Sequence, residues 1–232
     1  MASLIDLIRS LFQTRLNGVY PARIVNNQDP SGLGRVRVSL PDPSGGSNKP
    51  VEAWTPVTTL MAGNKRGTWF IPEPGDEVLL AFEGGDISRP YVLGSLWSAE
   101  NPPPEQMDPA GQNAVKSIHS RNGVTVSIYD VNGDETLALK TPGGQSLTLR
   151  DGDGGSVEIK DANGNQIRLT ATGVQVLAAA KLALNASQVE ISAGSLTVNS
   201  GMSTFSGVVK ADTVIANSVV SASYSPGAGN VM

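Results

Sequence analysis

A repeat of apolar pairs fills the second half of the chain. Each pair consists of two apolar residues separated by one polar or small residue. The pairs begin at Val126, Leu137, Leu147, Val157, Ile167, Val174, Leu182, Val189 and Leu196. Consecutive pairs are ten or eleven residues apart up to Ile167 and seven or eight residues apart beyond it. Turn sequences such as Asn132-Gly133 separate the earlier pairs. The repeat predicts a long series of short, evenly spaced β-strands.

Such short strands cannot enclose a core within one chain. A single-chain β-helix needs roughly eighteen residues per coil, as strand and turn lengths imply. Three chains that each supply seven or eight residues would complete such a coil, so the repeat predicts an intertwined homotrimer. The predicted trimer core consists of Val157, Ile159, Ile167, Leu169, Val174, Val176, Leu182, Leu184, Val189, Ile191, Leu196 and Val198.

The composition of this region agrees with a narrow threefold core. No aromatic residue lies between residues 130 and 204, and thirteen of the fifteen prolines lie at or before Pro109. Aromatic rings would not fit beside a narrow axis, and proline cannot donate to a strand ladder. Three chains in continuous register also leave few exposed sheet edges.

Charge and composition exclude several classes of function. The 232 residues carry a net charge of −4, no cysteine and a single histidine, His119. The acidic balance argues against a general nucleic-acid binder, and no apolar run is long enough for a transmembrane helix. Disulfides, thiolate metal sites and multi-histidine sites are excluded, and a Ser-His-Asp hydrolase is disfavoured. We therefore assign no catalytic, cofactor-binding or metal-binding residue and expect no cofactor and no enzymatic activity.

The first half of the chain has a different pattern. Residues 18–97 predict a small antiparallel β domain, in which Val36, Val38 and Leu40 alternate inward and Glu77–Phe82 forms a central strand. Five strands in about eighty residues suit an oligonucleotide/oligosaccharide-binding (OB) barrel. The domains expected are a helix over 1–17, an OB domain over 18–97, a proline-rich linker over 98–112 and a trimeric β-prism over 113–232. The fold class is therefore all-β apart from the short N-terminal helix: a five-stranded OB-type barrel followed by an intertwined trimeric β-helix or β-prism.

The N-terminal segment and the aromatic residues each allow two interpretations. The helix places Leu4, Ile8, Leu11 and Phe12 on one side, and this face packs either on its own domain or on another protein. The aromatic residues of the OB segment fill its core or form a platform for bases, and we favour the core. They are Trp54, Trp69, Phe70, Phe82 and Trp97.

Residues 20–97 resemble the OB domain of phage baseplate assembly protein V and of the related VgrG-type spikes of contractile injection systems. The matching motifs are Asp29-Pro30 with Gly32-Leu33-Gly34-Arg35-Val36, Ile71-Pro72 with Pro74-Gly75-Asp76-Glu77-Val78, and Arg89-Pro90 with Gly94-Ser95-Leu96-Trp97. Residues 116–130 resemble the start of the spike's β-prism, and residues 224–230 are similar to spike C-termini.

The resemblance implies a homotrimeric spike that is attached to a baseplate hub and driven through the target envelope on sheath contraction. The hub contact is then the helix with Leu4, Ile8, Leu11 and Phe12. A PAAR-repeat protein is expected to cap the C-terminal end, through Tyr224, Pro226, Asn230, Val231 and Met232. Some related spikes bind iron at the apex through a His-x-His motif, which this sequence lacks. The implied location is a virion or extracellular injection-system baseplate, assembled in the cytoplasm of the producing cell. Nucleic acid is not expected as a partner, and contact with the target envelope is expected to be transient.

Other functions stay open as alternatives. One is a nucleic-acid or glycan-binding OB module with an oligomerising tail, and another is a tailspike that degrades envelope polysaccharide. Asp130, Asn132 and Asp134 have the first spacings of a calcium loop, but glycine occupies the fourth position instead of the sixth, so we expect a turn. We also expect a turn at residues 151–155, and a strand-surface or interface position for His119.

Overall fold

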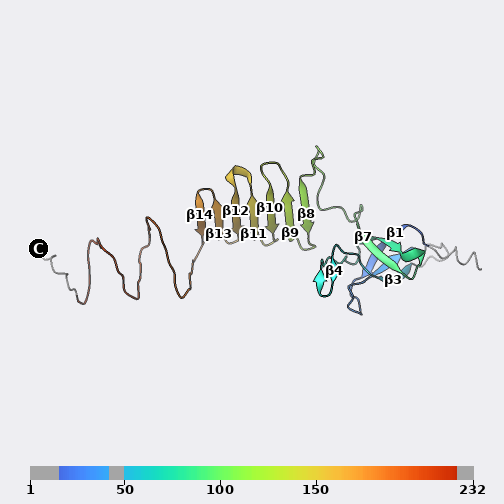
Figure 1. Cartoon of the computed structure of the whole chain (residues 1–232), viewed down its shortest axis with the longest axis horizontal. Helices are drawn as coiled ribbons and strands as arrows, with labels where there is room; N and C mark the ends of the chain where they lie inside the picture. Colours follow the sequence, from blue (N-terminus) through green and yellow to red (C-terminus); the bar gives the residue numbers. More distant parts are fainter. Residues whose placement is uncertain (1–15, 42–49, 224–232) are drawn as a thin grey trace, which may run out of the picture. The chain divides into compact units, whose positions relative to one another are not determined.

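The first sheet is an antiparallel sheet of five strands. The computed structural model describes residues 16–41 and 50–223, and Figure 1 shows the strands in chain order. The strands of this sheet are β1 (Val19–Asn26), β2 (Val36–Leu40), β3 (Val51–Thr55), β6 (Glu77–Phe82) and β7 (Pro90–Leu96). They lie in the order β3-β2-β1-β6-β7, so β6 is an inner strand, as the sequence predicts.

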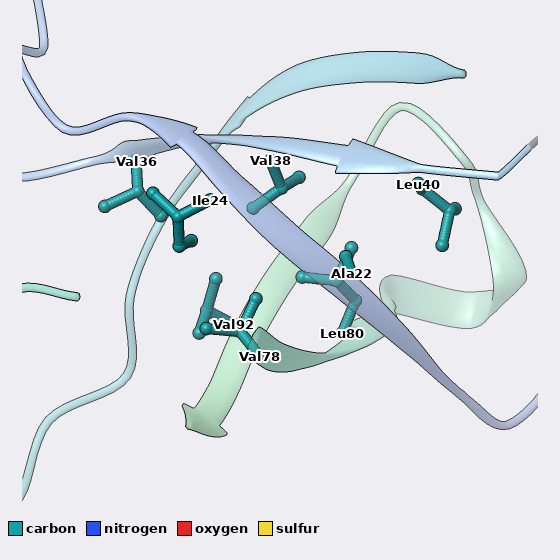
Figure 2. Packing of buried hydrophobic residues seen from close by; sticks show 8 residues of the cluster. All are labelled: Ala22, Ile24, Val36, Val38, Leu40, Val78, Leu80 and Val92. Atoms are coloured by element: carbon teal, nitrogen blue, oxygen red, sulfur yellow. The ribbon is translucent and has the colours of Figure 1, made fainter. Parts of the chain in front are cut away.

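The core of this sheet is aliphatic. Alternation places Val36, Val38 and Leu40 of β2 inward, and all three are buried, which confirms the sequence prediction. Figure 2 shows how the buried side chains converge from β1, β2, β6 and β7. The cluster consists of Ala22, Ile24, Val36, Val38, Leu40, Val78, Leu80 and Val92.

The two outer strands of this sheet meet at one point. A parallel bridge joins Val57, just after β3, to Val92 of β7, and the amide of Thr58 donates to the carbonyl of Val92 at 2.9 Å. The sheet therefore curls towards the expected barrel but does not close into one, because a single bridge and no ladder joins its two sides. A small hairpin of β4 (Ala62–Gly63) and β5 (Arg66–Gly67) lies in the connection to β6, and the 3₁₀ turn η1 (Glu83–Gly85) joins β6 to β7.

The prediction that the five aromatic residues fill this core is wrong for three of them. Trp69, Phe70 and Trp97 are 70–75% exposed. Trp54 is half-buried, and Phe82 packs against the cluster, with its ring edge-on to Tyr20 at 5.6 Å. The physical reason is that eight aliphatic side chains already fill the space between the strands, while Trp69, Phe70 and Trp97 lie outside them.

The second sheet is a seven-stranded antiparallel meander. Each strand pairs with the next one along the chain, and every strand has five residues. The strands are β8 (Val115–His119), β9 (Thr125–Tyr129), β10 (Thr136–Lys140), β11 (Ser146–Arg150), β12 (Ser156–Lys160), β13 (Gln166–Thr170) and β14 (Gly173–Leu177); the 3₁₀ turn η2 (Gly152–Gly154) joins β11 to β12. The predicted strands from Val126 to Val176 are confirmed. Their pairing is within one chain, however, and differs from the intertwined arrangement expected for this stretch. A ten-residue repeat is long enough for a five-residue strand and a tight hairpin, so each strand finds its partner next to it.

The regular pairing of strands ends after β14. Residues 178–223 contain no strand, and the chain divides into two compact units between Lys181 and Leu182. The expected strands at Leu182, Val189 and Leu196 are therefore absent from the single chain. Here the repeat is seven or eight residues long. The step from β13 to β14 is also seven residues and still forms a hairpin, so the spacing alone does not explain why the strands are absent.

Two expected elements lie outside the described residues. They are the helix with Leu4, Ile8, Leu11 and Phe12, and the tip contact with Tyr224, Pro226, Asn230, Val231 and Met232. No helix in the part of the chain that the structure describes is long and apolar enough to cross a membrane.

Candidate trimer interface

One face of the seven-stranded sheet carries two unbroken rows of apolar side chains. The cross-strand partners in the first row are Ile118, Val126, Leu139, Leu147, Ile159, Ile167 and Val176. Those in the second row are Ile128, Leu137, Leu149, Val157, Leu169 and Val174. Because side chains alternate between the two faces of a strand, both rows lie on the same face. We call this face the apolar face.

The apolar face is uncovered within one chain. Leu149 is 39% exposed, Ile159 is 48% exposed and Val174 is 69% exposed. Contiguous apolar surface of this length on a soluble protein marks an interaction site, and a sheet needs a second layer on its apolar face. Within residues 16–41 and 50–181, no segment covers this face, so it is available to a partner.

The opposite face of the sheet is polar. Thr148, Glu158 and Arg168 occupy its middle row on β11, β12 and β13. Nζ of Lys160 lies 2.7 Å from Oε2 of Glu158, so this carboxylate is paired within the chain. Ser127 and Ala138 of the same row are buried. The face therefore suits solvent, and the two faces of each strand have opposite roles.

The carboxylates of the suspected calcium loop are engaged with basic side chains. Nζ of Lys116 lies 2.7 Å from Oδ2 of Asp130, and Nη2 of Arg150 donates to Oδ2 of Asp134 at 3.1 Å. The hydrogen bond from Arg150 lowers the pKa of Asp134. Among the described residues, no three His, Asp or Glu side chains group closely enough to hold a metal ion. The segment forms the hairpin between β9 and β10.

The other candidate positions also lie in connections. Residues 151–155 contain η2, in which Asp153 adopts a left-handed φ of 56°. His119 is the last residue of β8, and its Nε2 lies 3.1 Å from Oε1 of Glu105. This places His119 on the strand surface, as expected.

The hairpin between β12 and β13 is organised by Asp161. The backbone amides of Asn163 and Asn165 donate to Oδ1 of Asp161 at 2.9 and 2.8 Å. The hydrogen bond from the side-chain amide of Asn165, together with these backbone bonds, lowers the pKa of the carboxyl group of Asp161. The hairpin between β10 and β11 needs Gly144. The φ of Gly144 is +87°, and an added Cβ there would lie 3.2 Å from Cβ of Ala162. Sequence-specific turns thus set the strand register.

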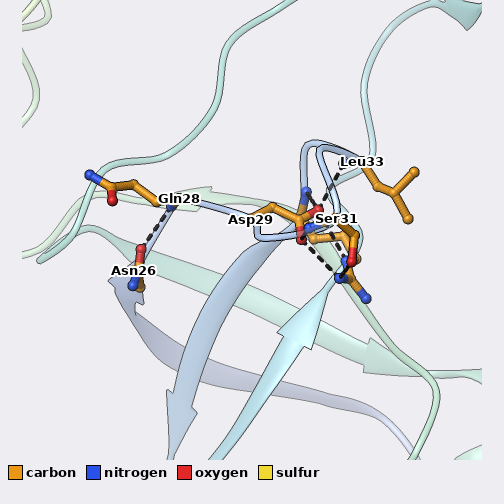
Figure 3. Close-up of polar contacts among 6 residues, drawn as sticks. Asn26, Gln28, Asp29, Ser31 and Leu33 are labelled. Carbon is orange, nitrogen blue, oxygen red and sulfur yellow. Dashed lines mark hydrogen bonds and ion pairs between the residues drawn. The ribbon is translucent and has the colours of Figure 1, made fainter.

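In the first sheet, Asp29 organises the loop between β1 and β2 (Figure 3). The amides of Ser31 and Leu33 donate to its carboxylate at 3.0 and 2.9 Å, and Nη2 of Arg35 lies 2.8 Å from Oδ1. The bond from Arg35 is the main reason why the pKa of Asp29 lies far below its usual range. Leu33, at the tip of this loop, is 73% exposed. It lines a groove together with Met61, Trp69 and Phe70.

The structure divides the predicted trimer-core residues into two groups. The first six, from Val157 to Val176, lie on the apolar face. The other six lie in the strandless stretch and are exposed: Leu182, Leu184, Val189, Ile191, Leu196 and Val198. The prediction missed the earlier members of the same face, from Ile118 to Leu149. The signal for them was present, because the repeat begins at Val126.

Comparison with known proteins finds two domain models that match this chain. The model of the type VI secretion system/phage-baseplate injector OB domain matches residues 20–97. The model of the phage baseplate V C-terminal trimerisation domain matches residues 136–201. The first match covers the five-stranded sheet, and the second covers β10 to β14 and the stretch that follows.

The curated relatives are spike proteins of type VI secretion systems. VgrG1a of Pseudomonas aeruginosa is 31% identical over 104 residues, which are 44% of this chain and 16% of that protein. VgrG4b of the same organism is 38% identical over 93 residues, or 39% of this chain and 11% of that protein. VgrG3 of Vibrio cholerae is 36% identical over 73 residues, or 31% of this chain and 7% of that protein. The chain thus spans less than a fifth of these relatives. On the matches to both domain models, it belongs to the family of phage-baseplate V and VgrG-type spike proteins.

Proposed function

We propose that this chain is the central spike of a contractile tail or injection-system baseplate, and that it acts as a homotrimer without enzymatic activity. The apolar face of the seven-stranded sheet is the observation that carries this proposal. Its first row spans all seven strands and its second row spans β9 to β14, both without a cover, and most of their residues lie in the segment that matches a trimerisation domain. Three copies of the sheet, each turned with this face inward, would form a prism with a dry core.

A prism of this kind suits mechanical work. Hydrogen bonds between neighbouring strands run along the length of each sheet, and the three sheets would brace one another around the axis. The tight hairpins leave no long loop between β8 and β14. On sheath contraction, such a rod would carry a compressive load through the target envelope without buckling, and its unfolding would be slow.

The partners follow from the same proposal. A baseplate hub would bind at the N-terminal end, through the predicted helix, and a PAAR-repeat protein would cap the C-terminal end. Both contacts involve segments outside the described residues. The trimer would belong to a virion or to an extracellular baseplate. One relative from Vibrio cholerae is named actin cross-linking toxin VgrG1, and this chain covers 7% of that protein.

The test is the mass of the purified full chain in solution. Light scattering on a sizing column should give three times the chain mass of 24.1 kDa, with early elution as an elongated particle. An unboiled detergent gel should keep the trimer, and boiling should release the monomer. A compact monomer would refute the spike. Salt-sensitive binding of single-stranded DNA by that monomer would favour the alternative OB binding module, and cleavage of envelope polysaccharide would favour the tailspike.

A further inference from the structure

On the apolar face, the residues just beyond the two ends of the strands form two edges that differ in chemistry. Backbone hydrogen bonds extend the ladder one residue beyond the strands, for example from the amide of Asp151 to the carbonyl of Glu135 at 3.0 Å. At the opposite ends of the strands, the amide of Thr141 donates to the carbonyl of Gln145 at 3.0 Å. Each of these residues lies two positions from a member of the apolar rows, so it belongs to the same face.

We name the two edges by their residues. The acidic edge, read from β9 to β13, consists of Asp130, Glu135, Asp151, Gly155 and Ala171. The amide edge, read over the same strands, consists of Val124, Thr141, Gln145, Asp161 and Asn165. Every strand from β9 to β13 thus has one residue on each edge.

Two carboxylates of the acidic edge have no side-chain partner among the described residues. Neither Glu135 nor Asp151 forms an ion pair or a side-chain hydrogen bond there, and both are exposed. Asp130 differs, because Lys116 pairs with it inside the chain. A carboxylate next to a buried apolar face needs a donor if that face is covered.

The amide edge carries donors on the same strands as these two carboxylates. The hydroxyl of Thr141 donates to Oε1 of Gln145 at 2.5 Å. The amide nitrogen of Gln145 therefore keeps its two N–H donors for another acceptor. Asp161 and Asn165 are already bonded to each other, and they need no outside partner.

A closed threefold ring forces these edges together. Three identical sheets with their apolar faces inward meet head to tail, so one edge of each sheet contacts the other edge of the next. We infer that, in the trimer proposed above, the acidic edge of one chain docks against the amide edge of the next copy, strand against equivalent strand. Glu135 then contacts Thr141, whose hydroxyl turns from Gln145 to donate to the carboxylate, and Asp151 contacts the amide nitrogen of Gln145.

The residues that flank β12 and β13 support the same register. There, Gly155 of the acidic edge is opposite Asp161, and Ala171 is opposite Asn165, so the self-bonded polar pair meets residues without polar side chains. A shift by one strand in one direction would place Asp151 opposite Asp161, and two carboxylates would repel each other. The opposite shift would place Glu135 opposite Val124, which has no donor.

We call the contact between the acidic edge of one chain and the amide edge of the next the seam. Disulfide cross-linking tests this seam directly, because the chain has no cysteine of its own. Glu135 and Thr141 lie at opposite ends of β10, about 20 Å apart at roughly 3.3 Å per residue. A disulfide requires Cα atoms within about 7 Å. In a full-length variant that combines Glu135→Cys with Thr141→Cys, only a bond between chains can therefore form, and oxidation should give covalent trimers on a boiled, non-reducing gel.

Two controls make the outcome decisive. The combination of Glu135→Cys with Asn165→Cys should give no covalent trimer, because β13 is three strands away from β10. The combination of Glu135→Cys with Gln145→Cys reports a shift by one strand, and a higher yield from it would overturn the proposed register. Light scattering on the reduced proteins tests the trimeric spike separately from the seam between its chains. A reduced trimer that forms no cross-link between positions 135 and 141 on oxidation would overturn the seam alone, whereas a reduced monomer would overturn both the seam and the spike.

Discussion

At the scale of single residues, the stability of the first sheet depends on a carboxylate that serves as a loop scaffold. Asp29 accepts hydrogen bonds from the amides of Ser31 and Leu33 and pairs with Arg35, whose own pKa is raised by this contact. Only the ionised carboxylate can accept all of these bonds. The pKa of Asp29 is therefore held below its ordinary value of 3.8.

This depression has a defined pH dependence. The folded chain binds the proton of Asp29 only at lower pH than the unfolded chain does, so the ionised form stabilises the fold above about pH 4. The contribution is lost as the pH falls through 3.8 towards the folded pKa. Asp29→Asn should lower the melting temperature at pH 7 and should flatten its decline between pH 5 and pH 2.

Tryptophan fluorescence is the appropriate measurement. All three tryptophans, Trp54, Trp69 and Trp97, lie between residues 54 and 97, so their emission reports on the first sheet and its loops. Asp153→Asn serves as the control, because the side chain of Asp153 is 86% exposed. An equal pH profile for the wild type and Asp29→Asn would contradict the role given to this carboxylate.

At the scale of elements, the two sheets are stabilised in different ways. The first sheet buries Leu80 completely within its own core. Leu80→Ala should cost about 3 kcal/mol of unfolding free energy, as large-to-small changes in cores do, and should leave the trimer mass unchanged. Tryptophan fluorescence in denaturant measures the loss. Leu60→Ala is the matched control, since Leu60 is 97% exposed, and a similar loss in both variants would rule out the core as the cause.

The second sheet offers a comparison between adjacent residues of one strand. Leu149 lies on the apolar face, and Thr148 lies on the polar face of the same strand, β11. Leu149→Lys should prevent assembly, because a trimer would bury three unpaired charges near its axis. Thr148→Lys should leave the mass of three chains intact. The light-scattering mass at equal concentration measures both, and a trimeric Leu149→Lys protein would show that the apolar face is not the interface.

The sequence predicts these elements to different extents. The periods of two and ten residues predict the strands of both sheets, because alternation and tight turns are local properties. The position of the aromatic residues was not predictable in the same way. Trp69 and Phe70 lie in an exposed connection, since a few aliphatic side chains from distant strands fill the core. Likewise, the repeat does not show whether a strand pairs within its chain or with another chain. A seven-residue step forms a hairpin between β13 and β14, whereas the seven-residue steps after Leu182 form no strand in the single chain.

At the scale of the whole molecule, the repeat region contains two kinds of structure. Up to β13, ten or eleven residues provide a strand and a hairpin, the seven-residue step to β14 provides one more hairpin, and each chain pairs with itself. From Leu182 to Val198, the shorter repeat continues the apolar pairs, while the single chain has no strand from residue 178 to residue 223. Backbone amides that are covered in a rod must be paired. We expect the strands of this stretch to form only between chains, in the intertwined arrangement that the seven-residue steps predict.

Hydrogen exchange distinguishes the two kinds of structure within one sample. In the trimer, amides in residues 182–198 should exchange slowly, by about a hundredfold or more relative to an unstructured peptide. In Leu149→Lys held as a monomer, the same amides should exchange freely, whereas those of β12 should keep their protection, because their partners on β11 and β13 belong to the same chain. Fast exchange of residues 182–198 in the wild-type trimer would mean that the short repeat stays unpaired. The rod would then end at β14, and the stretch beyond it would need a partner other than its own copies to become rigid.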